Sequence, residues 1–312
     1  MAFAFVFPGQ GSQSLGMQSA LAAEHPEVSA TYREASEGLG YDLARLVAEG
    51  PEADLNATER TQPAMLTAGV AAFRVWRGRG GAAPAVVSGH SLGEVTALVC
   101  AGALDFRTAV DLVRFRGQVM QEAVPAGSGA MAAILGLEDD AVEAVCREAA
   151  RGQVVECANF NSPGQVVIAG EAAAVQRALD MAKGRGAKRA LLLPVSVPSH
   201  TSLMKGAAAR LGERLAATEV KAPEIRYVSA VDALAHQEPE DIRALLVRAL
   251  FSPVRWTQAL RALAAQELAQ VIECGPGKVL TGLNKRIERR PGLEYFALED
   301  PAGVAAALAA TG

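Results

Sequence analysis

The sequence predicts an α/β fold with a mainly parallel sheet and a smaller inserted subdomain. Strand-like and helix-like segments alternate over most of the 312 residues, and this alternation is typical of a parallel sheet with helices on its faces. Half of the residues are hydrophobic but only 5% are aromatic, which suits helices rich in Ala, Val and Leu packed on a buried sheet. One internal segment breaks the alternation and indicates the insertion.

Apolar runs and helical periodicity place the elements of the larger part in chain order. The first run, Phe3–Phe7, is ended by Pro8-Gly9 and predicts a core strand rather than a signal peptide. Further strands are expected at Ala85–Ser88, Arg226–Val228 and Leu268–Cys274. Helices are expected at Leu15–Ala23, Gln62–Arg77, Leu92–Ala101, Arg107–Ala123, Ile242–Ala249 and Trp256–Ala265, and a last one within Pro301–Gly312.

The internal segment has a different order of elements. It follows a flexible, glycine-rich entry at Pro125–Gly129, and a turn is expected at Asn161–Gly164. In order, strands and helices are expected at Met131–Leu135, Asp140–Ala150, Val154–Asn159, Gln165–Ile168, Ala172–Arg185 and Arg189–Leu193. The resulting βαββαβ order is typical of a ferredoxin-like module. The sequence therefore predicts a large subdomain of residues 1–127 and 195–312 and a small subdomain of residues 128–194.

Charge and hydropathy exclude several classes of partner. The formal net charge is −4 and the pI is about 5.7, which argues against nucleic acid or an anionic membrane as the main partner. No apolar run reaches the roughly 18 residues of a membrane span, and the first residues lack the basic region of a signal peptide. We therefore expect a cytoplasmic protein. No cluster of metal ligands stands out, and neither a metal nor a cofactor is expected.

The stretch Gly89-His90-Ser91-Leu92-Gly93 fits the G-x-S-x-G pattern of a nucleophile elbow. A strand leads into it and a helix follows, so Ser91 is expected on a sharp turn where flanking glycines avoid clashes. The first N–H groups of the helix face the same point, and the N–H of Leu92 is suited to stabilise a tetrahedral oxyanion. Ser91 is therefore a candidate nucleophile. The alternative is a glycine-rich turn with an incidental serine.

A serine nucleophile needs a base, and the chain has four histidines. His25 is expected in solvent at a helix end, His236 in a loop, and His90 on the turn itself, pointing away from Ser91. His200 follows an apolar stretch and is the candidate base by elimination, although a buried structural histidine is the alternative. The acids between Ser91 and His200 are expected in surface helices, so a dyad oriented by a backbone carbonyl is favoured over a triad.

Arg116 lies on the apolar stripe of its predicted helix, together with Ala109, Val113 and Met120. A buried arginine is costly unless a carboxylate meets it, and its planar group suits a two-point pair. The carboxylate belongs either to an internal Asp or Glu or to the substrate. Combined with an acyl-transferring serine, the second alternative indicates a malonyl thioester, which has an acyl carbon at one end and a carboxylate at the other.

These residues lie in stretches by which the chain resembles the malonyl-CoA:acyl carrier protein transacylases of fatty acid synthesis and the related acyltransferase domains of polyketide synthases. The likeness runs nearly end to end. The matching stretches are Phe5–Gln13, Thr61–Ala64, Gly89–Glu94, Arg116–Pro125, Asn159–Gly170, Val195–His200 and Gly275–Leu283. The resemblance implies a hydrolase-like body with a ferredoxin-like insertion. It also implies malonyl transfer from malonyl-CoA to the phosphopantetheine thiol of acyl carrier protein, through a malonyl-serine intermediate.

The resemblance further implies individual roles. These are Ser91 as nucleophile, His200 as base, the N–H groups of Gln10 and Leu92 as oxyanion hole, Arg116 as carboxylate ligand, and Gln62 and Asn161 as pocket residues. The family often has Gln where this chain has Ala249, whose backbone carbonyl would orient the histidine. The family's Asn-Asn-Val-Asp stretch is Ser229–Asp232 here, so a side-chain role at Ala230 is not expected.

Because carrier proteins are acidic, a basic docking surface is expected. Two clusters qualify, Lys183, Arg185, Lys188 and Arg189 in the insertion, and Lys285, Arg286, Arg289 and Arg290 near the C-terminus. Each is alternatively an ordinary solvated face. Two other functions stay open at this stage: a serine esterase or thioesterase that shares the elbow, and a non-catalytic scaffold.

Overall fold

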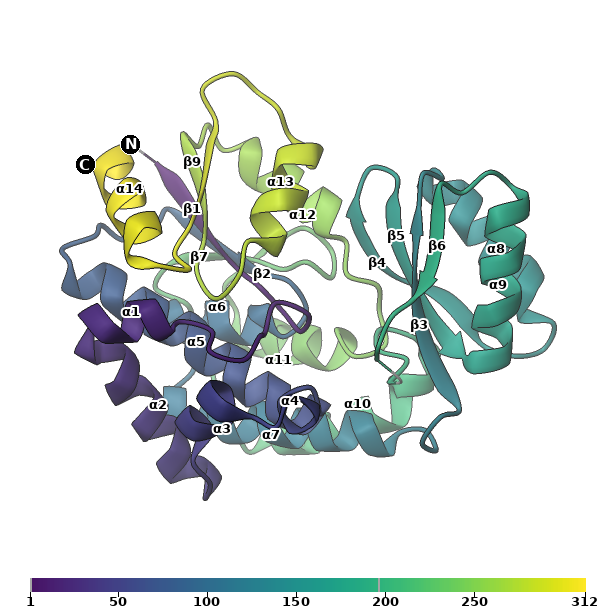
Figure 1. The fold of residues 1–312 in the computed structure, drawn as a ribbon, viewed down its shortest axis with the longest axis horizontal. Helices are drawn as coiled ribbons and strands as arrows, with labels where there is room; N and C mark the ends of the chain where they lie inside the picture. The colour runs from purple at the N-terminus through teal and green to yellow at the C-terminus, as the bar shows by residue number, and fades with distance from the viewer. Residues whose placement is uncertain (1, 196) are drawn as a thin grey trace.

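A computed structural model describes residues 2–195 and 197–312. The chain forms a large body around a six-stranded sheet and a smaller unit around a four-stranded sheet, and the two lie side by side (Figure 1). This confirms the predicted α/β fold. Among the described residues, no helix combines the length and apolar character that crossing a membrane requires.

The sheet of the large body is parallel except at one edge. Its strands, in spatial order, are β10 (Glu294–Ala297), β9 (Gln270–Glu273), β1 (Phe3–Phe7), β2 (Val86–Gly89), β7 (Arg226–Val228) and β8 (Ala235–His236). Only the β7–β8 pair is antiparallel. Every residue of β1 is buried, as expected for a central strand with helices on both faces.

The two faces of β1 serve two separate cores, because successive side chains of a strand point to opposite faces. Phe3, Phe5 and Phe7 join the larger core, whereas Ala4 and Val6 join the smaller one. The helices of the large body are α1 (Ser19–Glu24), α2 (Pro26–Leu39), α3 (Leu43–Glu49), α4 (Glu52–Leu55), α5 (Thr58–Gly78), α6 (Gly93–Cys100), α7 (Phe106–Glu122), α10 (Lys205–Ala216), α11 (Pro239–Arg248), α12 (Trp256–Ala264), α13 (Val279–Ile287) and α14 (Pro301–Thr311).

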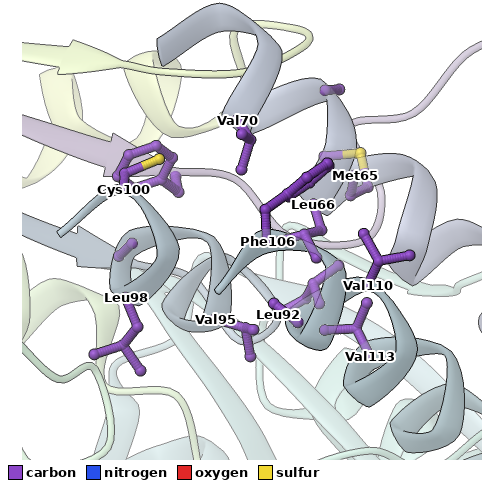
Figure 2. Packing of buried hydrophobic residues seen from close by; sticks show 14 of the residues in the cluster. Met65, Leu66, Val70, Leu92, Val95, Leu98, Cys100, Phe106, Val110 and Val113 are labelled. Atoms are coloured by element: carbon purple, nitrogen blue, oxygen red, sulfur yellow. The ribbon is translucent and has the colours of Figure 1, made fainter. Parts of the chain in front are cut away.

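Helices α5, α6 and α7 pack together in the larger core. Figure 2 shows Met65 and Leu66 of α5 facing Val95 of α6 and Val110 of α7 across a continuous apolar contact region. Leu92, the residue after Ser91, is 1% exposed within this region. The start of α6 is therefore anchored in the core, which fixes the position of the preceding turn.

The smaller unit has the predicted βαββαβ order. Its elements are β3 (Gly129–Leu135), α8 (Asp139–Ala150), β4 (Val155–Ser162), β5 (Gln165–Glu171), α9 (Ala172–Gly184) and β6 (Arg189–Leu192). The sheet is antiparallel in the order β4-β5-β3-β6, and α8 and α9 cover one face (Figure 1). This confirms the ferredoxin-like unit, while the subdomain boundaries at 127/128 and 194/195 stay a prediction.

Backbone hydrogen bonds join the small unit to the large body. Phe160 N–H donates to the Val254 carbonyl at 2.9 Å, and Val254 N–H donates to the Ala158 carbonyl at 2.9 Å. Strand β4 therefore pairs with the segment between α11 and α12. Main-chain pairing at this point fixes how the small unit is attached to the large body.

Several local predictions were incomplete. The sequence interpretation missed α2, α3, α4, α10 and α13, and strands β8 and β10. The first helix was expected from Leu15 but begins at Ser19, because Gly16 and Gln18 adopt left-handed backbone angles with φ of 71° and 61°. The turn expected at 161–164 is shorter, since β4 continues to Ser162.

Candidate active site

Ser91 lies on a strained turn between β2 and α6. Its φ is 53°, in the left-handed region that non-glycine residues rarely adopt. A Cβ on Gly89 would lie 1.9 Å from the Gly93 carbonyl carbon, and a Cβ on Gly93 would lie 2.0 Å from the Phe7 carbonyl oxygen. Both positions therefore exclude any side chain, and the pattern reflects close backbone packing under the serine.

The Ser91 hydroxyl contacts the ring of His200. Ser91 Oγ lies 2.8 Å from His200 Nε2, and His200 Nδ1 lies 2.7 Å from the Ala249 carbonyl oxygen. Because a carbonyl can only accept, Nδ1 carries the proton and Nε2 accepts from the serine. The backbone N–H of His200 also donates to the Leu250 carbonyl at 2.9 Å. The end of α11 thus holds both the main chain and the ring of this histidine.

His200 is neutral at ordinary pH. It is 4% exposed, and burial, together with the nearby Arg116 cation, lowers its pKa to about 3. A neutral imidazole in hydrogen-bond contact with a serine is suited to remove its proton.

Among the described residues, no other histidine side chain hydrogen-bonds Ser91. His90 Nε2 pairs with Asn161 Oδ1 at 2.8 Å, which links Asn161 to the residue before the serine, and its role in the pocket stays a prediction. The expectation for His25 was wrong, because it is 6% exposed at the junction of α1 and α2. The loop expected at His236 was also wrong, since this residue lies in β8 and contacts Asp232.

The sequence interpretation missed Glu94. Acids after Ser91 were expected at the surface, but Glu94 is 2% exposed. Its Oε1 accepts from Tyr227 Oη at 3.0 Å, from Ser229 Oγ at 2.7 Å and from Ala230 N–H at 2.7 Å. In the part of the chain that the structure describes, no Asp or Glu hydrogen-bonds the His200 ring. The geometry is therefore that of a dyad.

Arg116 reaches the serine from α7. It is 4% exposed, its Nη1 donates to Gln62 Oε1 at 2.8 Å, and its Nη2 lies 3.4 Å from Ser91 Oγ. Burial lowers its pKa to about 10 and the charge of Glu94 opposes this shift, so the group remains a cation at neutral pH. Within residues 2–195 and 197–312, no carboxylate forms an ion pair with it. A buried cation beside a nucleophile is suited to bind an anionic group of a ligand.

Two backbone N–H groups, those of Leu92 and Gln10, were expected to form the oxyanion hole. Leu92 is the N-cap of α6, and Gln10 follows β1, with its side chain 3.4 Å from Thr58 Oγ1. Among the described residues, neither N–H donates to a protein acceptor. A free donor at a helix start, as at Leu92, is suited to stabilise the negative charge of an oxyanion, and the role of Gln10 stays a prediction.

Two cavities border the residues of the site. A cavity of about 560 Å³ is lined by residues of both units, including Cys157, Phe160, His200, Phe251 and Arg255. On the inner side, the space bounded by Ser91 and Arg116 is only about 10 Å³, roughly one water molecule. A larger cavity of about 800 Å³ lies among α1, α2 and α3, away from Ser91. The cavity between the two units therefore reaches His200, whereas Ser91 and Arg116 line only the small inner space.

The chain matches the family model described as the acyl transferase domain over residues 4–290. It is 56% identical over 306 residues to the malonyl CoA-acyl carrier protein transacylase of Escherichia coli (strain K12), covering 98% of each chain. The chain belongs to the malonyl CoA-acyl carrier protein transacylase family. It is therefore an acyltransferase.

Solved structures of this family agree over the whole chain. An acyl carrier protein S-malonyltransferase from Vibrio cholerae has 56% identity and a TM-score of 0.95, covering 98% of this chain and 100% of that one. A malonyl-transacylase solved with a type II polyketide acyl carrier protein has 53% identity and a TM-score of 0.97, covering 99% of each chain.

Two departures from the usual pattern of the transacylase family are accommodated by the backbone. Ala249 has no polar side chain, yet its carbonyl accepts from His200 Nδ1 at 2.7 Å. Ala230 likewise uses its N–H, which donates to Glu94 at 2.7 Å. Neither contact requires the amide side chain that the family often has at these positions.

Proposed function

We propose that this transacylase transfers a malonyl group from malonyl-CoA to the phosphopantetheine thiol of an acyl carrier protein. One observation carries the proposal: the Ser91 hydroxyl lies close to both a base and a cation. Its Oγ is 2.8 Å from His200 Nε2 and 3.4 Å from Nη2 of the buried Arg116. The names of the relatives support the same substrates. The relative solved with a polyketide carrier protein supports a role in fatty acid or polyketide synthesis. We place the enzyme in the cytoplasm.

In the first half-reaction, Ser91 Oγ attacks the thioester carbon while His200 Nε2 takes its proton. The oxyanion accepts from the N–H groups of Leu92 and Gln10. The C–S bond then breaks, and His200 returns the proton to the CoA sulfur. A malonyl-serine ester remains.

In the second half-reaction, the carrier thiol gives its proton to His200 and attacks the ester. The ester C–O bond breaks, and His200 returns the proton to Ser91. The product is malonyl-acyl carrier protein, and the sequence of two transfers is ping-pong. Water is not a reactant in either half-reaction.

Arg116 holds the malonyl carboxylate by two parallel hydrogen bonds, with Gln62 fixing the guanidinium from the other side. This ion pair also affects the base. The Arg116 cation lowers the pKa of His200, and a bound carboxylate offsets that charge. His200 is therefore a stronger base when malonyl is present than when the site is empty.

The covalent step is tested by intact mass spectrometry. After exposure to malonyl-CoA, the mass should rise by one malonyl group, located on Ser91 by peptide mapping, and Ser91→Ala should carry none. Adding holo acyl carrier protein should remove the group, whereas buffer without a thiol should not. An adduct that persists in Ser91→Ala, or rapid loss to water alone, would contradict the proposal in favour of another residue or a hydrolase.

A further inference from the structure

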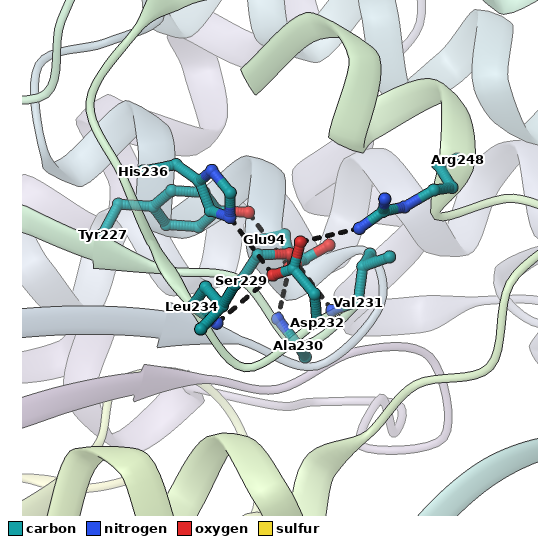
Figure 3. A network of polar contacts seen from close by, with 9 residues as sticks. All are labelled: Glu94, Tyr227, Ser229, Ala230, Val231, Asp232, Leu234, His236 and Arg248. Carbon is teal, nitrogen blue, oxygen red and sulfur yellow. Dashed lines mark hydrogen bonds and ion pairs between the residues drawn. The ribbon is translucent and has the colours of Figure 1, made fainter. Parts of the chain in front are cut away.

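Glu94 connects the nucleophile helix to a distant part of the chain. It is the second residue of α6, and its backbone N–H donates to the Ser91 carbonyl at 3.0 Å. Its carboxylate accepts three hydrogen bonds from Tyr227, Ser229 and Ala230, where the chain leaves β7 (Figure 3). A buried carboxylate with three donors makes strong, charge-assisted bonds. The first turn of α6 is therefore fixed to the residues that follow β7.

Those residues form a compact turn, residues 229–234, which we call the brace. Ser229 N–H donates to the Leu234 carbonyl at 3.0 Å, and Ala233 N–H donates back to the Ser229 carbonyl at 2.9 Å. Ser229 Oγ also accepts from Val231 N–H at 3.1 Å while it donates to Glu94. The turn is thus closed on itself and has a defined shape.

The far side of the brace holds the end of α11. Asp232 accepts from Arg248 Nη2 at 2.7 Å and contacts His236 Nε2 at 3.1 Å, and Figure 3 shows Arg248 reaching Asp232 from its helix. Arg248 is the last residue of α11. The next residue, Ala249, supplies the carbonyl that accepts from the His200 ring.

We propose that Glu94 is a positioning residue for the dyad, acting through the brace. Its carboxylate fixes α6 and Ser91 on one side of residues 229–234, and Asp232 fixes Arg248, Ala249 and His200 on the other. A single rigid turn then sets the distance between Ser91 Oγ and His200 Nε2. The inference rests on the proposed roles of Ser91 and His200.

Both residues of the dyad have a strained backbone that the surrounding structure must hold in place. Ser91 and His200 both have left-handed backbone angles, with φ of 53° and 63°. Such angles persist only where the surrounding structure holds them. Of the two links, the buried one at Glu94 should matter more, because Asp232 and Arg248 are 24% and 46% exposed in their side chains, and exposed ion pairs contribute little.

The test measures Ser91 reactivity without the natural substrate. A fluorophosphonate forms a bond between phosphorus and Ser91 Oγ and releases fluoride, and its labelling rate per folded molecule reports the dyad alone. Glu94→Leu removes every acceptor and should lower this rate by about 100-fold, the effect of a displacement of about 1 Å. Glu94→Gln keeps the shape and one acceptor oxygen but loses the charge that strengthens the bonds, so its rate should lie between that of Glu94→Leu and that of the wild type, clearly below the latter. Asp232→Asn should have a smaller effect than Glu94→Leu.

Glu273 provides a matched control. Like Glu94, Glu273 is buried and holds the start of a helix, but it lies at the end of strand β9. Its carboxylate accepts from Leu280 N–H at 3.1 Å and from Thr281 N–H at 2.7 Å. Glu273→Gln should lower the melting temperature and leave the labelling rate per folded molecule unchanged. For malonyl transfer, Glu94→Leu should lower kcat while KM for malonyl-CoA stays constant.

The possible outcomes separate the two proposals. If wild-type Ser91 reacts and Glu94→Leu reacts equally fast per folded molecule, positioning by Glu94 is wrong and the proposed function stands. If Glu94→Leu does not fold, Glu94→Gln decides: its rate per folded molecule should fall below that of Glu273→Gln, and an equal rate overturns the proposal. If wild-type Ser91 does not react at all, its role as nucleophile fails, and the role of Glu94 fails with it.

Discussion

Arg116 has neutral partners where a buried cation ordinarily has an anionic one. Its nearest acceptors are Gln62 and the Ser91 hydroxyl, and within the described residues no Asp or Glu forms an ion pair with it. Glu94 contributes only a more distant charge. This arrangement leaves the guanidinium incompletely compensated in the empty enzyme, as expected for a group that completes its pairing with a ligand.

Arg116→Ala should therefore impair malonyl transfer far more than acetyl transfer. Loss of one partner of a buried charge pair costs about 3–5 kcal/mol, or a factor of hundreds to thousands in rate. Acetyl-CoA has no carboxylate, so its loading should hold or improve. Arg116→Lys should restore only part of the malonyl rate, because an ammonium cannot form two parallel bonds. The measurement is kcat/KM for both thioesters.

A structural role for Arg116 predicts a different pattern. The variant would then lose melting temperature and be equally poor with both thioesters. The ratio of malonyl to acetyl rates in the same preparation distinguishes the two cases, because unfolded protein lowers both rates alike.

His200 should remain an active base well below the usual histidine range. Its pKa is lowered from 6.5 to about 3, so acidification from pH 7.5 to 5 should leave the fluorophosphonate labelling rate of Ser91 nearly constant. An ordinary histidine would lose most of its neutral form over this interval. A rate that halves near pH 6.5 would show that the ring is not shielded in this way.

The lowered pKa of His200 also predicts how this residue affects the stability of the folded protein. Between the folded value of about 3 and the ordinary 6.5, the unfolded state binds more protons than the folded state, so stability is lost as the pH falls through this window. His200→Gln removes that contribution. Its melting temperature should decline less than that of the wild type between pH 7 and 4.5, a difference that thermal unfolding at several pH values measures directly.

At the level of elements, the turn before α6 depends on glycines that no other residue can replace. A Cβ at position 93 would lie 2.0 Å from a backbone oxygen of β1, and neither chain can move without disturbing the sheet. Gly93→Ala should destabilise the protein by about 3 kcal/mol, the upper end of the range for an overpacked core. Gly282 of α13 is the control, because its Cβ would meet nothing within 4 Å. Gly282→Ala should stabilise by about 0.5–1 kcal/mol. Urea unfolding measures both changes, and equal effects would contradict the packing argument.

Local pattern explains which elements could be predicted from sequence. The turn at Ser91 was predictable because the strand, the glycines and the helix lie within a few consecutive residues. The burial of Arg116 was predictable because its helix has a regular apolar stripe that includes this residue. Glu94 was not, since its donors lie 133 to 136 residues further along the chain. The orienting role of Ala249 came only from resemblance, because a backbone carbonyl leaves no signal in the side-chain sequence. Helix α10 was missed although its buried residues Ala207, Leu211 and Leu215 have regular helical spacing, whereas strand β10 has only four residues and a weak local pattern.

On the scale of the whole molecule, the two basic clusters expected from the sequence are partly one surface. Arg286 Nη1 of α13 donates to Gln165 Oε1 of β5 at 3.1 Å. Gln165 pairs with Leu135 of β3, which pairs with Arg189 of β6. Two strand spacings of this kind amount to roughly 10 Å, so Arg189 and Arg286 face the same region from different units.

Three of the other basic residues have contacts elsewhere. Lys183 pairs with Asp180, and Arg185 pairs with Glu148. Arg290 donates to two backbone carbonyls of the large body and is a structural residue. The surface that spans the junction, with Arg189 and Arg286, is therefore the better candidate for an acidic carrier protein, and it adjoins the seam between the two units.

Charge reversal tests this surface. Arg189→Glu with Arg286→Glu should lower kcat/KM for malonyl transfer to carrier protein by about 10–100-fold at low salt, because opposite charges accelerate encounter. The remaining rate should depend less on salt than the wild-type rate, since fewer attractive pairs are left to screen. Loading of Ser91 from malonyl-N-acetylcysteamine, a thioester without phosphates, should not change, because that reagent meets only the dyad and Arg116. Lys183→Glu with Arg185→Glu is the matched control: it makes the same change in net charge on the far side of the small unit and should reduce transfer much less. Equal losses in the two double variants would mean that total charge, rather than this surface, governs the encounter with the carrier.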